Sequence, residues 1–101
     1  MRFLVKAILG TEAGNKSIRD GSMVKNMKEY FGQVKPEAVY MTLAHGKRAI
    51  IMIVNISSPD KMPLIAEPLW NMLGAEVHVS PVMEQADLEK AMPELEKMFK
   101  K

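Results

Sequence analysis

The sequence predicts an α+β domain whose elements follow the order βαββαβ, with an extra helix at the C-terminus. Four short segments are rich in branched and aromatic residues and are bounded by turn-forming residues, as strands are. Three other segments repeat apolar residues at helical spacing. The 101 residues fit a single domain (1–101), since a chain of this size buries about two thirds of its surface on folding.

The first half of the chain is predicted to be strand, helix, strand. The strand covers residues 2–9, and a polar, glycine-containing connection follows at 11–15. A helix then begins at Ser17 or at Ser22, and Gly32 is expected to end it in a left-handed conformation. The apolar residues that give this helix its spacing are Ile18, Val24, Met27, Phe31 and Val34.

A hairpin is predicted at the centre of the chain. Strands over residues 39–44 and 48–56 flank His45 and Gly46, and glycine accepts the positive φ that tight turns require. Every residue from 49 to 54 is apolar. An unbroken apolar run of this kind is typical of a strand that is buried on both faces.

The second half is predicted to repeat strand, helix, strand. Asp60 caps a helix that ends at Gly74, and Pro68 is expected to kink or break that helix because proline has no N–H to donate. An alternating strand follows over residues 75–82. A last helix, capped by Asp87, completes the chain.

This order is that of the split βαβ, ferredoxin-like plan. It implies a four-stranded antiparallel sheet with the helices on one face and with the first and third strands at its centre. Alternation then leaves a face with no helix over it, which displays Leu4, Ile8, Tyr40 and one apolar set of the third strand. Because such a face is too apolar for water, we expect a homodimer or a higher oligomer that buries it.

The segment at residues 62–83 carries a resemblance. It contains an IAEP stretch at 65–68 and an alternating strand that runs into Pro81-Val82-Met83. In these features the chain resembles the dimeric α+β barrel superfamily and is similar to a small uncharacterised microbial family. The resemblance implies dimerisation, and superfamily members include cofactor-free oxygenases, isomerases and small-molecule-binding domains. No catalytic motif of one subfamily matches residue by residue.

Composition excludes several classes of protein. The formal net charge is +2, and residues 48–54 display no aromatic side chain, so we expect no nucleic-acid partner. With no cysteine and only two histidines, at different ends of the sheet, no metal and no cofactor are expected. No apolar run is long enough to span a membrane, so no membrane partner and a cytoplasmic location are expected.

Two functional hypotheses remain beside a purely structural interaction module. The first is binding of a small apolar molecule between helices and sheet, because methionines pack adaptably. Its residues are Met27, Met41, Met62, Met72 and Trp70. The alternative is a cofactor-free oxygenase or isomerase for an apolar or aromatic substrate, with His78 as base, Glu76 as its orienting carboxylate, and Lys6 or Tyr40 as oxyanion partner.

Overall fold

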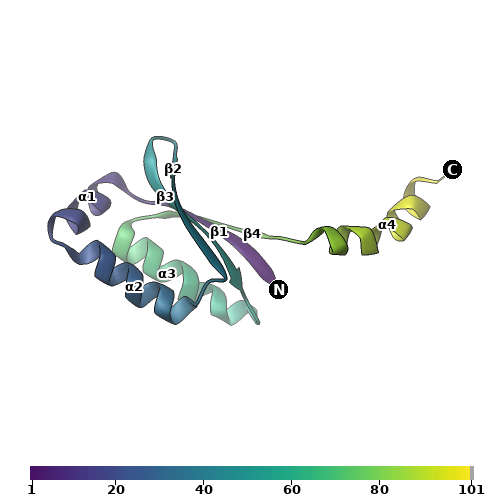
Figure 1. Cartoon of the computed structure of the whole chain (residues 1–101), viewed down its shortest axis with the longest axis horizontal. Helices are drawn as coiled ribbons and strands as arrows, with labels where there is room; N and C mark the ends of the chain where they lie inside the picture. The colour runs from purple at the N-terminus through teal and green to yellow at the C-terminus, as the bar shows by residue number, and fades with distance from the viewer. Residues whose placement is uncertain (101) are drawn as a thin grey trace.

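The computed structural model describes residues 1–100 and has the predicted α+β, ferredoxin-like architecture (Figure 1). The four strands form one antiparallel, open sheet in the order β2-β3-β1-β4. The first and third strands are therefore central, as predicted. The elements are β1 (Arg2–Ile8), α1 (Thr11–Arg19), α2 (Ser22–Val34), β2 (Ala38–Ala44), β3 (Lys47–Asn55), the short 3₁₀ turn η1 (Pro59–Lys61), α3 (Met62–Leu73), β4 (Glu76–Pro81) and α4 (Gln85–Phe99).

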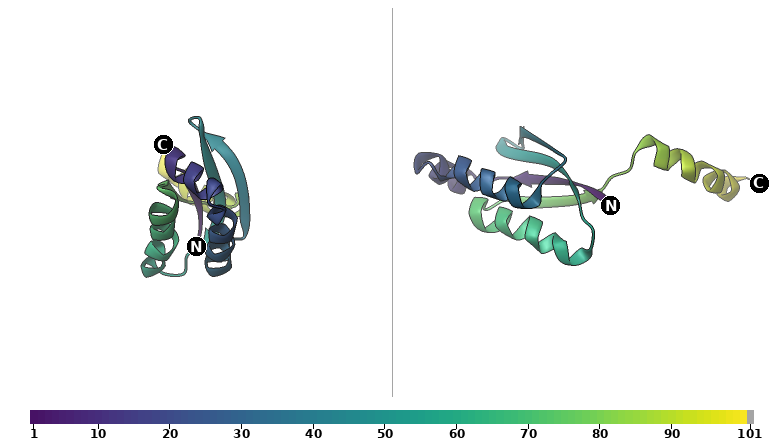
Figure 2. Two further views of the ribbon diagram at one scale, coloured as in Figure 1. Left: turned by 90° about the vertical axis from the view of Figure 1, so that its left-hand side faces the viewer. Right: turned by 60° about the horizontal axis from the view of Figure 1, so that its bottom comes forward.

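Helices α1, α2 and α3 lie on one face of the sheet, and the other face has no helix over it (Figure 2). The core lies under the helices, where Val5, Met52 and Val54 are each at most 1% exposed. The sequence left open which apolar set of β3 points toward the helices, and in the structure this set is Ile50, Met52 and Val54. The predicted tight turn is also present, with φ of 53° at His45 and 75° at Gly46.

The first helical region differs from its prediction. The segment expected to be a polar connection is helix α1, and a left-handed Gly21 separates it from α2. Contacts with the sheet stabilise α1, since Arg48 on β3 donates a hydrogen bond to Asn15 at 3.0 Å and packs closely against Gly14. Gly32 does not end α2, which continues to Val34 and is closed by Lys35 at a φ of 52°.

Helix α3 runs through Pro68 without splitting, so of the two predicted alternatives the break is absent. Pro68 cannot donate to the carbonyl of Leu64, but Leu64 is 63% exposed, so water can replace the missing donor. The helix ends at Gly74, as predicted, with a φ of 54°. It begins after η1, so Asp60 lies within that turn rather than at the N-cap of α3.

Helix α4 projects away from the rest of the chain (Figure 1), which gives the molecule extents of 62 × 28 × 19 Å. We call residues 1–81 the body and α4 the arm. The arm begins three residues earlier than predicted, because Glu84, rather than Asp87, is the N-cap residue and the two form a reciprocal capping box. No described residue of the arm is buried. In residues 1–100, no helix has the length and hydrophobicity needed to cross a membrane.

Candidate functional site

An apolar groove lies between α3 and β4 and has a volume of about 280 Å³. Apolar side chains form almost all of its wall, and Glu67 is its only ionisable residue. The lining residues are Ile56, Met62, Pro63, Ile65, Ala66, Glu67, Trp70, Val77 and Val79. Typical ligand pockets have volumes of about 300–1,000 Å³, so a groove just below the small end of this range can hold only a small apolar molecule.

The groove exists because α3 leaves the inner side of β4 partly uncovered. One stripe of α3, with Ile65 and Leu69, packs onto the core and is buried. The neighbouring stripe carries Met62 and Trp70, which lie at the groove and are 39% and 49% exposed. On the edge strand β4 every second side chain points toward the helices. The half-buried valines at these positions form the opposite wall of the groove.

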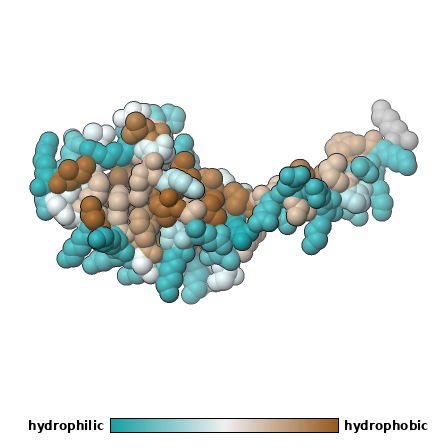
Figure 3. Space-filling model, in the orientation of Figure 1, coloured by the Kyte–Doolittle hydropathy of each residue, from teal (hydrophilic) through white to brown (hydrophobic). Residues whose placement is uncertain are grey.

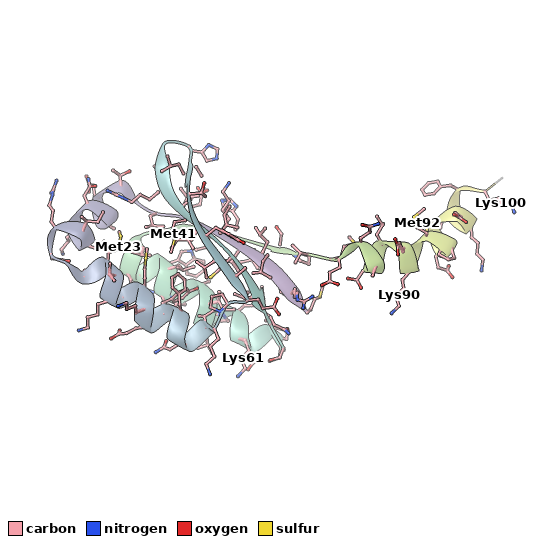
Figure 4. The ribbon with its side chains drawn as sticks, viewed as in Figure 1. Met23, Met41, Lys61, Lys90, Met92 and Lys100 are labelled. Atoms are coloured by element: carbon pink, nitrogen blue, oxygen red, sulfur yellow. The ribbon has the colours of Figure 1, made fainter. Side chains whose placement is uncertain are left out.

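The structure separates the residues that were predicted to bind a ligand together. Met62 and Trp70 line the groove. Met27 and Met72 line a crevice of only about 10 Å³ between α2 and α3. Met41 lies on the hairpin strand β2, where the helices do not reach, and is 58% exposed (Figure 4). These five residues therefore do not form one cavity.

Tyr30, which sequence reasoning missed, closes the space between α2 and α3. Its hydroxyl donates a hydrogen bond of 2.7 Å to the backbone carbonyl of Ile65, and its ring packs edge-on against Phe31 at 5.6 Å. Burial raises the pKa of Tyr30 above its ordinary value. The available signal was its place beside Phe31, next to the apolar stripe of α2.

The residues of the alternative, catalytic hypothesis lie on the open face. His78 and Lys6 are register partners on β4 and β1, and Lys6 and Tyr40 both pair with Ile51. The ring nitrogen Nε2 of His78 lies 2.5 Å from a carboxylate oxygen of Glu76. This hydrogen bond and the charge of the imidazole lower the pKa of Glu76.

These residues of the catalytic hypothesis lie apart from the groove. None of its residues lines the groove between α3 and β4, and the side chains of His78 and Glu76 are 56% and 66% exposed. The two groups can orient each other, but both are largely exposed, so a substrate beside them in one chain would stay in contact with water. Among residues 1–100, no three metal-ligating side chains cluster.

Hydropathy differs between the body and the arm (Figure 3). Apolar residues gather on the body beside the strands, whereas along α4 they alternate with polar ones. The exposed large apolar side chains include Tyr40 and Leu43 on the hairpin and Met92 and Phe99 on the arm. Both regions thus display apolar surface that the single chain leaves uncovered.

Comparisons with known proteins return likeness of shape alone. No protein-family model matches the sequence, and no curated protein sequence matches it. The de novo designed protein Ferredog-Diesel is similar in structure, with a TM-score of 0.48 and 13% identity over 80% of this chain and 85% of that one. A crystal structure of the protein Atu4242 from Agrobacterium tumefaciens has a TM-score of 0.39 and 16% identity, over 84% of this chain and 96% of that one.

Proposed function

We propose that this protein is a homodimeric domain that binds a small, neutral, apolar molecule in the groove between α3 and β4. The groove itself carries the proposal. Trp70 and Met62 leave about half of their surface in water at its rim, so a ligand that covers them is stabilised by the hydrophobic effect. Glu67 disfavours anionic ligands, and the apolar wall disfavours any charged group because it would lose its hydration, so a neutral ligand fits best.

Binding is favoured over catalysis by the position of the ionisable groups. A general base has to reach the reacting proton within hydrogen-bond distance. His78 and Lys6 lie on the open face, whereas the groove lies on the helical side of the sheet. A ligand in the groove therefore has no histidine or lysine within the described residues that line it.

The dimer is proposed from the open face. Leu4, Ile51 and Ile53 are only half-buried there, and Tyr40 at the edge is 68% exposed. Ile8, which the sequence also placed in the interface, is 6% exposed within one chain, so it has little area left to bury. Resemblance to the dimeric α+β barrel superfamily implies a barrel of two such sheets, and the proposal requires that a second copy covers the face.

The fluorescence of Trp70 tests the ligand site, because Trp70 is the only tryptophan of the chain. Naphthalene serves as the neutral probe and decanoate as the anionic comparison. We expect naphthalene to change the emission saturably and decanoate to bind at least tenfold more weakly. Ala66→Phe fills the groove and should abolish the response, whereas Ala86→Phe on the exposed arm should keep it. An equal response in both variants would refute the site.

A further inference from the structure

The arm carries an apolar stripe that no other element within residues 1–100 covers. Leu88, Met92, Leu95 and Phe99 follow the spacing i, i+4, i+7 and i+11 and lie on one side of α4, with Ala91 and Met98 beside them. Met92 is 41% and Phe99 77% exposed, and no described element makes an extensive contact with α4. Isolated helices of about 15 residues are marginal in water, so this stripe needs a partner surface.

Charge identifies the kind of surface that the stripe fits. Helical spacing places Glu89 and Glu96 along one border of the stripe and Asp87 and Glu94 along the other. Lys90 points away from Met92 (Figure 4), and Lys97, seven residues further along the helix, shares its side by helical spacing. A stripe with acidic borders is repelled by an anionic membrane, because such a membrane attracts helices whose apolar side is bordered by lysine and arginine. It fits an apolar surface that carries cations.

The open sheet face is such a surface. Its centre is formed by Leu4, Ile51 and Ile53, and it carries Lys6 and Lys47, neither of which forms an ion pair within residues 1–100. Among the outward positions of the four strands, Glu76 is the only carboxylate, and it is occupied by His78. The groove between α3 and β4 fits the stripe less well, since its charged residue is Glu67.

The segment at residues 82–84, which we call the root of the arm, directs α4 away from its own sheet. Arg2 binds a carboxylate oxygen of Glu84 at 2.7 Å, and its backbone carbonyl accepts the N–H of Val82 at 3.1 Å. A second bond from Arg2, to Glu37 at 2.8 Å, holds that guanidinium against the end of β2. With this root fixed, α4 extends beyond the end of the sheet (Figures 1 and 2).

We propose that two copies exchange arms, so that α4 of each copy lies across the open sheet face of the other. The stripe packs on Leu4, Ile51 and Ile53, while its acidic borders face Lys6 and Lys47. This inference rests on the proposed dimer but replaces the barrel of two sheets, because the arm of the second copy, rather than its sheet, covers the face. It is reciprocal, as a two-fold interface requires.

The dimensions agree with this exchange. At about 1.5 Å per residue, α4 is roughly 22 Å long. Four strands spaced about 4.8 Å apart form a sheet roughly 15–20 Å across, so one helix spans one face. Each contact would bury on the order of 500 Å² of the stripe and a similar area of the sheet face. The two contacts together then reach roughly 2,000 Å², which lies in the range of stable homodimers.

Sedimentation of full-length variants tests whether the stripe holds the dimer. We expect the parent chain to be a dimer and Leu88→Asp with Met92→Asp to raise its dissociation constant at least tenfold. Ala86→Asp, on the rear of the same helix, should leave the constant unchanged. Lys6→Glu with Lys47→Glu should also weaken the dimer, and adding Glu89→Lys and Glu94→Lys, one from each border, should restore it.

Cross-linking then tests where the arm lies, since the chain has no cysteine of its own. A chain with Ala91→Cys is mixed with a chain carrying Thr42→Cys on the open face, and a short bismaleimide is added. We expect a covalent heterodimer in this mixture and none when the second chain carries Lys28→Cys on the outer side of α2. Heterodimer with Lys28→Cys alone would overturn the proposed placement.

The outcomes separate this inference from the proposed dimer. If the stripe variant remains as tight a dimer as the parent, arm exchange is refuted and a sheet-to-sheet dimer stands. If the parent is a monomer at micromolar concentration, the dimer and the arm exchange are both refuted, while binding of naphthalene remains a separate result. A monomeric parent whose stripe binds phosphatidylserine vesicles would refute the inference in favour of a membrane.

Discussion

The two faces of the sheet share the same strands but differ in what covers them. On the inner face, Val5 and Met52 are at most 1% exposed under the helices. On the outer face, their chain neighbours Leu4 and Ile51 are equally apolar yet remain half-buried. The comparison shows that these strands carry more apolar surface than the helices of one chain can cover. The outer face is therefore where a second copy has the most to bury.

Helices α3 and α4 show the same difference. Both have an apolar stripe at helical spacing, but the stripe of α3 is buried on the core and that of α4 has no partner in its own chain. A stripe of this kind predicts that a helix forms and which side it buries. It does not specify the surface that it packs against, which depends on the rest of the fold or on another copy.

The largest effect is expected on the inner face. Met52→Ala should lower the free energy of unfolding by about 2–5 kcal/mol, because it leaves a cavity in a closely packed core. Ile51→Ala, one residue away on the outer face, should cost about 1 kcal/mol when measured on dilute, monomeric protein. Urea unfolding measures both, and equal losses would contradict the assignment of the two faces.

The two tyrosines offer a second contrast. Tyr30→Phe removes a buried hydrogen bond to the carbonyl of Ile65 and should cost about 1–2 kcal/mol in thermal or urea unfolding. Tyr40→Phe on the exposed edge strand should change stability by less than about 0.5 kcal/mol. A larger loss for Tyr40 than for Tyr30 would mean that the outer face is covered even in the isolated chain.

Much of the fold could be predicted from the sequence, because alternation and helical spacing report directly on which side of an element is buried. The order of the elements and the strand order followed from those patterns. Helix α1 was missed because a contact with Arg48, rather than an apolar stripe, stabilises it. The end of α2 was misplaced because Lys35, and not glycine, adopts the left-handed conformation.

The candidate site was harder to predict than the fold. Met62 and Trp70 both lie on α3, and the structure places both at the groove. Spacing within single elements could not indicate that Met27 and Met72 lie in another crevice, between α2 and α3. The buried stripe of α3 separates that crevice from Met62 and Trp70. Strand alternation also could not indicate that Met41 is 58% exposed, since the reach of the helices over the hairpin depends on their lengths and tilts.

A third, smaller effect tests whether the arm is independent of the body. Asp87→Ala removes one half of the capping box and should destabilise α4 by about 0.5–1 kcal/mol, seen as lost helical signal in circular dichroism. In dilute, monomeric protein the urea midpoint of the body should stay the same, because no described element of its own chain makes an extensive contact with α4. Glu94→Ala, further along the helix, is the control and should retain the helical signal. A shift of the body's midpoint would show that the two regions are coupled.

The smallest effect is expected from the exposed pair on the outer face. The hydrogen bond from His78 lowers the pKa of Glu76 below its ordinary value of 4.5 in the folded chain. A carboxyl of this kind adds stability above its unfolded-state pKa and loses that contribution as the pH falls through the folded-state value. Glu76→Gln should therefore lower the urea midpoint near neutral pH and match the parent in acid, whereas Glu29→Gln on α2 should match the parent throughout. Because the side chains of both partners are largely exposed, the loss of stability from Glu76→Gln should be smaller than the destabilisation of α4 by Asp87→Ala. A difference that grows as the pH falls would have the wrong sign for this pair.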